Sequence, residues 1–368
     1  MMKTYPLKSI SLDMAMNLQF KVVDEITNVF EGHDFITCGD LGVIPGLNKP
    51  SVTKKAEQVI ASVFDAESCI LVRGAGTGAI RYGLFAAMKP GGTLLVHKAP
   101  IYNTTKTSIE MMGIKTVEAD FNCPDEIEQV MKENPLISAA LVQYTRQSIE
   151  DRYDMEEVIT KIKSINDIPV ITDDNYAVMK VERIGTQCGA DLSCFSTFKL
   201  LGPEGIGCIV GKKNYIDFLV KHHYSGGLQT QGFEALEVLR GLTYAPVALA
   251  IQANVNEELQ ERLNENEMPE VKHAFLANAQ SKVLLVEFQE EIAEKVLYHA
   301  EKLGAAPNPI GAESKYEIAP MFYRISGTFR EAKPGLSDRM IRINPMRSGA
   351  DTVMRILKEA VKRAMSCS

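Results

Sequence analysis

From residue 69 to residue 210, short apolar segments rich in β-branched residues alternate with helical segments, and this alternation limits the possible folds most strongly. The expected strands are Cys69–Arg73, Thr93–His97, Lys115–Glu118, Ala139–Gln143, Val170–Asp173, Leu192–Ser196 and Gly207–Val210. The expected helices are Gly78–Met88, Thr104–Met112, Pro124–Glu133, Met155–Lys163 and, after the last strand, Phe233–Leu239. Such alternation is typical of a doubly wound, mostly parallel sheet. We therefore predict an α/β fold with a mostly parallel seven-stranded sheet wrapped by helices.

The flanking segments indicate three parts. Residues 1–50 combine an amphipathic helix over Ser11–Phe30 with a Gly/Pro-rich connector. Residues 51–250 form the large sheet domain, which opens with a helix from Ser51, a plausible cap, to Phe64. A further helix, from Pro246 to about Asn264, leads into a small C-terminal α+β domain over residues 251–368. The strands expected there are Val283–Phe288, Met321–Ser326 and Met340–Ile343.

Composition narrows the classes of partner. The chain has 368 residues, a net charge of −7 and no long basic run, so nucleic acid and anionic membrane surfaces are not expected partners. No apolar stretch approaches the roughly 18 residues that a membrane span needs, and we expect a cytoplasmic protein. The seven cysteines include no Cys-x-x-Cys pair, and the six histidines show no metal-ligand spacing. We therefore expect no metal site.

Polar side chains follow two of the expected buried strands. Asp173 and Asp174 end the segment that begins at Val170, and Lys199 follows the segment that ends at Ser196. Ligands of open α/β sheets sit at such strand ends. A lysine among apolar neighbours there is partly desolvated, which lowers the pKa of an amine and favours Schiff-base chemistry. The alternative for Lys199 is an ordinary surface lysine with an apolar stem.

A glycine-rich turn, Arg73-Gly74-Ala75-Gly76-Thr77-Gly78-Ala79, follows the first strand and opens a helix. Glycines let backbone N–H groups approach an anion, and a helix N-terminus is electropositive. The turn lacks both the Gly-x-Gly-x-x-Gly spacing of a dinucleotide site and the Gly-Lys-Ser/Thr of a Walker loop. It therefore predicts a phosphate site of another kind, or a helix cap with no ligand.

In this order along the chain, the motifs resemble those of fold-type I pyridoxal-phosphate enzymes, the aspartate aminotransferase superfamily. The closest likeness is to the lyases and synthases of cystathionine metabolism and to related aminotransferases. The segments that carry the likeness are Gly46-Leu47-Asn48-Lys49-Pro50-Ser51, Ala75-Gly76-Thr77-Gly78, Pro100-Ile101-Tyr102-Asn103-Thr104, Asp174-Asn175-Tyr176, Ser196-Thr197-Phe198-Lys199, Glu237-Val238-Leu239-Arg240-Gly241-Leu242 and Ile341-Arg342-Ile343-Asn344.

The resemblance implies pyridoxal 5'-phosphate (PLP) as cofactor and a role for each matching residue. Lys199 would hold the cofactor as an internal aldimine, Asp174 would pair with its ring nitrogen and Tyr102 would stack on its ring, with His97 as the competitor. Phosphate would be bound by Ala75, Gly76, Thr77 and Ser196. Arg342 would bind the substrate carboxylate, ahead of Arg324 and Arg347, and Arg146 is a further candidate for substrate contact. Asp173 is expected to be a structural, hydrogen-bonded carboxylate.

One departure from the family pattern bears on the reaction. Relatives of the cystathionine type carry Tyr-x-Arg just before their Asn-Pro-Thr segment and use it at the partner subunit's phosphate site. This chain has Val43-Ile44-Pro45 there, with neither hydroxyl nor guanidinium. The missing half of the phosphate clamp would come from elsewhere, with Tyr224–Thr230 as the candidate. The family likeness also implies a homodimer or homotetramer with shared active sites.

Four functions stay open at this stage. The first is a PLP-dependent enzyme acting on an amino acid, as an aminotransferase or a lyase. The second is a PLP-binding regulator without turnover, and the third is a cystathionine-type Cβ/Cγ–S lyase. A phosphate-sugar or nucleotide enzyme that uses only the glycine turn is the fourth, and it leaves the Asp174–Lys199 spacing unexplained.

Overall fold

The computed structural model describes residues 3–145, 148, 150–279, 281–311, 313–325 and 335–366. They divide into two compact units. The larger unit comprises residues 13–145 and 151–246, and the smaller comprises residues 247–368 together with 1–12 and 146–150. In the described part of the chain, no helix is long and apolar enough to cross a membrane.

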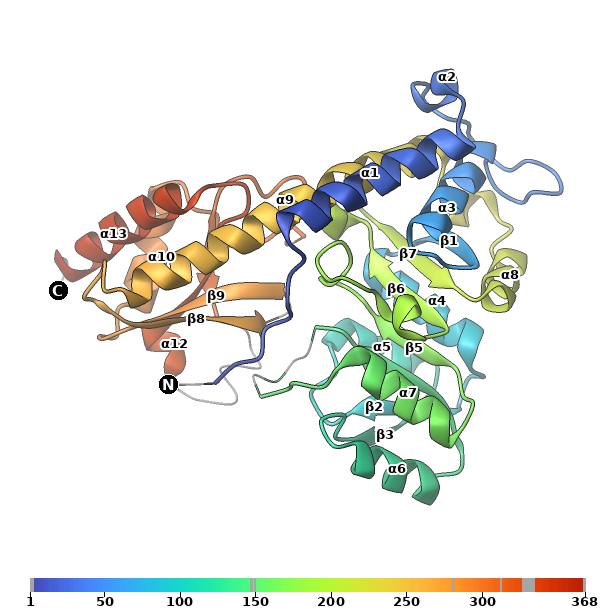
Figure 1. Cartoon of the computed structure of the whole chain (residues 1–368), viewed down its shortest axis with the longest axis horizontal. Helices are drawn as coiled ribbons and strands as arrows, with labels where there is room; N and C mark the ends of the chain where they lie inside the picture. The colour runs from blue at the N-terminus through green and yellow to red at the C-terminus, as the bar shows by residue number, and fades with distance from the viewer. Residues whose placement is uncertain are drawn as a thin grey trace. The chain divides into compact units, whose positions relative to one another are not determined.

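The larger unit is built on a seven-stranded sheet with the order β1-β7-β6-β5-β4-β2-β3 (Figure 1). Neighbours from β6 to β3 are parallel, and β7 runs antiparallel to both β1 and β6. The strands are β1 Ser68–Arg73, β2 Thr93–His97, β3 Lys115–Ala119, β4 Ile137–Gln143, β5 Val170–Asp173, β6 Leu192–Ser196 and β7 Ile206–Gly211. The predicted fold class is confirmed.

Helices cover both faces of this sheet, because side chains alternate between the faces along each buried strand. In β2, Leu94 and Val96 join a core cluster with α4, α5 and α8, while Leu95 joins a second cluster with α6 and α7. The helices of the larger unit are α1 Leu12–Val29, α2 Gly32–Phe35, α3 Ser51–Val63, α4 Ala75–Ala87, α5 Asn103–Met111, α6 Pro124–Glu133, α7 Met155–Ile165 and α8 Lys213–His222. Short 3-10 turns are η1 Gly185–Cys188, η2 Phe198–Leu200 and η3 Gly226–Leu228.

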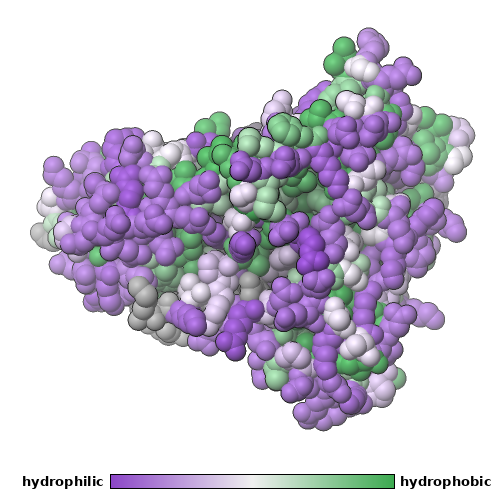
Figure 2. Space-filling view, viewed as in Figure 1, coloured by the Kyte–Doolittle hydropathy of each residue, from purple (hydrophilic) through white to green (hydrophobic). Residues whose placement is uncertain are grey.

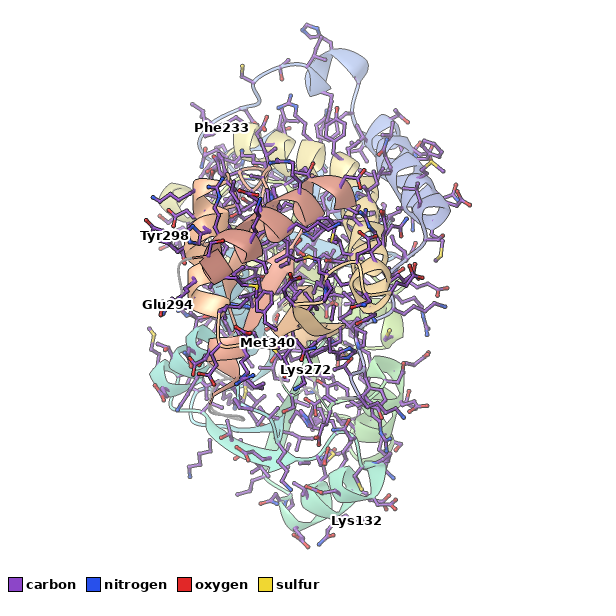
Figure 3. The ribbon with its side chains drawn as sticks, turned by 90° about the vertical axis from the view of Figure 1, so that its left-hand side faces the viewer. Lys132, Phe233, Lys272, Glu294, Tyr298 and Met340 are labelled. Atoms are coloured by element: carbon purple, nitrogen blue, oxygen red, sulfur yellow. The ribbon has the colours of Figure 1, made fainter. Side chains whose placement is uncertain are left out.

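The smaller unit is a four-stranded antiparallel sheet with the order β10-β11-β9-β8, covered by helices. Its strands are β8 Val271–Ala279, β9 Ser281–Phe288, β10 Met321–Arg324 and β11 Met340–Asn344. Its helices are α10 Ala293–Lys302, α12 Leu336–Arg339 and α13 Ala350–Ser366, with the C-terminal part of α9 Gly232–Asn264. Glu294 and Tyr298 lie one turn apart on α10 and both project outward (Figure 3).

Two local expectations were wrong. Residues Gly232–Asn264 form one continuous helix, α9, with Pro246 inside it, where two separate helices were expected. Buried side chains on both sides of the proline, such as Leu242 and Leu249, hold the helix together across the missing N–H. Ser51 does not cap α3: it is the first helical residue, and the carboxylate of Asp40 accepts hydrogen bonds from the N–H groups of Ser51 and Val52 at 2.6 and 3.0 Å.

Candidate active site

The ends of several strands bring the candidate residues to one edge of the large sheet. Strand β6 pairs with β5 through Cys194 and Asp173, and with β7 through Ser196 and Gly207. Because β1, β5 and β6 run in the same direction, their carboxyl ends lie at this edge. The glycine turn follows β1, Asp174 follows β5, and the Lys199 turn follows β6. This is the edge at which open α/β sheets bind ligands.

Asp174 is fully buried, and one of its oxygens has no hydrogen-bond partner in the described part of the chain. Its Oδ2 accepts a hydrogen bond from the Gly185 N–H at 2.9 Å, but no hydrogen-bond partner among the described residues reaches Oδ1. Burial raises the pKa of Asp174 to about 6, while Ser193 and the Gly185 amide oppose the rise. A buried carboxylate oxygen without a donor is costly, which indicates a ligand that supplies an N–H.

Asn175 connects three parts of the site. Its Nδ2 donates to Asp173 Oδ1 at 2.8 Å, and its Oδ1 accepts from the Ser196 N–H at 3.0 Å. A Cβ on Gly76 would lie 2.4 Å from Asn175 Oδ1, so only glycine fits there. Asp173 also accepts from the Asn175 N–H, and burial raises the pKa of Asp173, while Asn175 and Lys199 oppose the rise. Asn175 therefore fixes the ends of β5 and β6 against the glycine turn.

Lys199 lies in the half-buried 3-10 turn Phe198–Leu200. Leu201 follows with a left-handed φ of 62°, and helix α9 passes very close behind the turn. A Cβ on Gly241 of α9 would lie 2.6 Å from Gly202 N and 2.7 Å from Leu200 O. Glycine at position 241 thus lets α9 approach the turn that carries Lys199, and a larger residue would push the two apart. This close approach sets the position of the Lys199 backbone.

The Lys199 amine lies over an aromatic ring. Its Nζ is 3.6 Å from the centroid of the Tyr176 ring, within the range of a cation–π contact. Tyr176 has a left-handed φ of 66°, which is rare for a bulky residue. Neither this contact nor the bridging role of Asn175 was foreseen from the sequence, although both residues directly follow Asp174 in a motif that had been singled out.

The glycine turn has the geometry of an anion site at the start of α4. Gly74 and Ala75 adopt left-handed φ values of 99° and 53°, and both of their N–H groups donate to Gly205 O, at 2.8 and 3.0 Å. The Ala75 amide is thus engaged by the protein itself. The N–H groups of Gly76 and Thr77 belong to the first helical turn, where amides have no partner within the helix.

Tyr102 and His97 differ in what surrounds them. Tyr102 precedes α5, and its side chain is 42% exposed. His97 accepts a hydrogen bond from the Phe121 N–H through Nδ1 and bonds Asp151 through Nε2, both at 3.0 Å. Its ring also contacts Phe121 and Tyr153. His97 is therefore held by hydrogen bonds and ring contacts, whereas the Tyr102 side chain is largely open to solvent.

The expected carboxylate-binding arginines lie in the smaller unit. Arg342 on β11 is half-buried, donates from Nε to Arg324 O at 2.7 Å and places Cζ 4.1 Å from the Tyr323 ring centroid. Arg347 donates from Nη1 to Gln252 Oε1 at 3.1 Å, and its buried Nη2 has no partner among the described residues. Arg146 lies outside the described residues.

The segment that follows α8 is tied to the glycine turn. Arg73, the residue before Gly74, binds Glu234 through both terminal nitrogens and donates to Gln229 O at 3.0 Å. Thr230 is fully buried, whereas Tyr224 is 69% exposed. The candidate clamp segment Tyr224–Thr230 is thus anchored at one end and exposed at the other. The described residues contain no cluster of His, Cys, Asp or Glu suited to a metal ion.

Comparison with known proteins gives matches over nearly the whole chain. Residues 49–241 match the family Aminotransferase class-V, and residues 257–357 match the family YhfS-like, C-terminal domain. The chain is 54% identical to the uncharacterized protein YhfS of Escherichia coli (strain K12) over 360 residues, which span 98% of this chain and 99% of that protein.

Comparison with solved structures also gives matches over nearly the whole chain. The crystal structure of the pyridoxal-5'-phosphate dependent protein YhfS from Escherichia coli matches with a TM-score of 0.97 at 54% identity, covering 98% of this chain and 99% of that one. CalE6, a methionine gamma lyase from Micromonospora echinospora, matches with a TM-score of 0.72 at 16% identity, covering 94% and 98%. At that identity the likeness shows the fold alone.

Proposed function

Because the chain belongs to the class-V aminotransferase family of fold-type I pyridoxal-phosphate proteins, we propose that it binds PLP at Lys199 and uses it in the transamination of an amino acid. The family expected from the sequence is thereby confirmed. The observation that carries the proposal is the buried Oδ1 of Asp174, which no described residue pairs with, at the same sheet edge as Lys199. A protonated pyridine nitrogen supplies the N–H that this oxygen lacks.

Each candidate residue has a binding task in this proposal. Lys199 would hold the cofactor covalently, Asp174 would bind its ring nitrogen and Tyr102 would cover its ring. Gly76 and Thr77, whose amides lie in the first turn of α4, and Ser196 at the end of β6 would bind its phosphate. Ala75 shapes this turn through its backbone, since its N–H already donates to Gly205. When bound, the cofactor supplies an electron sink for the bond that breaks at the α-carbon.

The protein residues then provide proton transfer and orientation. Lys199 would be the base that takes the substrate's α-proton and the acid that returns a proton. Asp174 would stay ionised beside the positively charged ring nitrogen that it would bind, because an opposite charge favours the charged form of a carboxylate. We assign the substrate carboxylate to Arg342, whose planar guanidinium suits a two-point contact.

Transamination is favoured over elimination from cystathionine by the segment at residues 43–45. Relatives of the cystathionine type use a hydroxyl and a guanidinium there. In this chain Val43 and Ile44 are apolar side chains that are 37% and 41% exposed. The segment offers no group that could act on a sulfur leaving group.

A panel of amino acids tests the proposed reaction on PLP-saturated protein. We expect some of them to convert the cofactor to its amine form, seen as loss of the visible absorption band together with release of a keto acid. Asp174→Asn should slow this conversion by orders of magnitude, and Asp173→Asn should slow it much less. Thiol release from cystathionine at about 1–1000 per second would identify a lyase instead. No spectral change with any amino acid would favour a PLP-binding protein without turnover.

We also propose a homodimer, supported by the exposed face of α1 in the larger unit. The helix buries Ala15, Val22 and Ile26 on one face, yet Phe20 and Val23 on another face are 60% and 43% exposed. Figure 2 shows hydrophobic residues gathered along this helix. A helix that is apolar on both faces is normally covered on both.

Sedimentation velocity tests the dimer. Phe20→Glu should shift the protein toward monomer, whereas Lys21→Glu, beside it on the helix, should not. If the Tyr224–Thr230 segment completes the partner's phosphate site, a Lys199→Ala chain mixed with a chain altered in this segment should regain activity. A wild-type monomer with full activity would contradict this proposal.

A further inference from the structure

Tyr176 is the residue of the site whose geometry has no role in the function proposed above. Its ring centroid lies 3.6 Å from Lys199 Nζ and 5.6 Å from Lys180 Nζ. The ring is half-buried, and so is Lys199. A lysine ammonium at the shorter distance is attracted by the negative face of the ring, and partial burial strengthens that attraction.

The backbone of Tyr176 is held in a conformation that tyrosine disfavours. Its φ of 66° lies in the left-handed region. The neighbouring chain keeps it there: the N–H groups of Ala177 and Val178 donate to Asp174 O at 3.0 and 3.2 Å, and Thr145 Oγ1 donates to Asn175 O at 3.2 Å. Strained residues that the surrounding structure maintains are concentrated at functional sites.

We propose that Tyr176 is a positioning residue that binds the protonated Lys199 amine on its ring face, both in the cofactor-free protein and once Lys199 has taken the substrate's α-proton. The ring attracts only the charged amine, whereas attack on an aldehyde requires the neutral amine. Tyr176 therefore lowers the reactivity of the cofactor-free Lys199 amine toward an aldehyde and keeps a proton donor in a fixed place. The role as a proton donor rests on the proposed function, because Lys199 gives up the cofactor during a reaction only if a substrate amine displaces it.

The charges around the amine act in the same direction. The charge of Lys199 lowers the pKa of Asp173. The negative charge of Asp173 in turn favours the protonated form of the Lys199 amine. Asp173 is present in every Tyr176 variant and contributes equally to each. A change in Lys199 reactivity among these variants therefore reports on the ring.

Reductive methylation of the cofactor-free, full-length chain tests the proposal. Formaldehyde with cyanoborohydride labels neutral amines, and peptide mass spectrometry gives a rate for each lysine. Tyr176→Asn removes the ring but suits the left-handed backbone, because asparagine tolerates that region. Tyr176→Phe keeps the ring and is the matched control. At pH 7 we expect Lys199 to react roughly 5-fold faster in Tyr176→Asn than in wild type, and at the wild-type rate in Tyr176→Phe.

Lys180, farther from the same ring, should change less than Lys199 and serves as an internal reference. Equal Lys199 rates in wild type and Tyr176→Asn would overturn the proposal, and so would a fivefold increase in Tyr176→Phe. Unchanged circular dichroism and melting temperature show that a variant is folded. Because the assay contains no PLP, a protein that fails to bind PLP but shows the expected ratios would refute the proposed function and leave the role of Tyr176 standing.

Discussion

Replacing Asp174 by asparagine should make the cofactor-free protein more stable while it impairs the site. The folded protein raises the pKa of this carboxyl from 3.8 to about 6, chiefly through burial. Folded Asp174 thus holds its proton more tightly than unfolded Asp174 does. Ionisation of Asp174 therefore lowers the free energy of unfolding. This loss is absent well below pH 3.8 and complete above about pH 6. A shift of this size corresponds to about 3 kcal/mol.

Urea unfolding of the cofactor-free proteins measures this effect. Asparagine keeps the shape of the side chain and an oxygen for the Gly185 N–H, and it carries no charge at any pH. At pH 8 we expect Asp174→Asn to unfold with a free energy higher by up to about 3 kcal/mol. The advantage should shrink by roughly 1 kcal/mol at pH 5, where part of the wild-type carboxyl is protonated.

Asp191 provides a control of opposite sign. Burial acts to raise the pKa of this carboxyl, but its ion pairs with Lys212 and Lys163 and the Val170 N–H together lower it. Asp191→Asn should therefore destabilise the protein at pH 8, with a loss that diminishes as the pH falls through the native pKa. An Asp174→Asn protein that is less stable than wild type at pH 8, or whose advantage does not change between pH 5 and pH 8, would refute the reasoning.

Two further substitutions test how the site is positioned and how the unit that carries it is stabilised. Gly241→Ala should weaken PLP binding roughly 10- to 100-fold in a spectral titration, because the new Cβ would meet Gly202 N at 2.6 Å. Unchanged affinity would show that the approach of α9 does not set the lysine turn. Lys49→Met leaves the Glu57 carboxylate buried without its cation and should lower the free energy of unfolding by about 3–5 kcal/mol. Adding Glu57→Gln should recover part of that loss in urea unfolding, and no recovery would mean that lost packing, not charge, dominates.

The sheet was predictable, and the two principal candidate residues could be singled out, because their signals are local. Strand β5 was predicted with its observed bounds, Val170–Asp173, since a buried parallel strand is a short continuous apolar run. Asp174 and Lys199 stood out because charged side chains follow two such runs, at strand ends where open α/β sheets bind ligands. Strand β8, Val271–Ala279, was missed because it mixes alanine with Lys272 and His273 and resembles neither a continuous apolar run nor a strict alternation.

Other features depend on contacts between distant segments, which a single sequence does not reveal. Asp40 caps α3 from outside the helix, and Gly241 meets the lysine turn from a helix that begins at Gly232. The ring of Tyr176 meets Lys199 only because β5 and β6 are neighbours. In each case the residue type was visible in the sequence, but its partner was set by the sheet order and the helix path.

The central claim is that Lys199 carries PLP, and borohydride reduction tests it most directly. Purified protein saturated with PLP is reduced with borohydride, digested, and mapped by mass spectrometry for the peptide that carries the reduced cofactor. We predict one labelled peptide, with the label on Lys199, and no fixed label in a Lys199→Ala chain. A label on Lys180, on another lysine, or on none at all in PLP-saturated protein would contradict the claim.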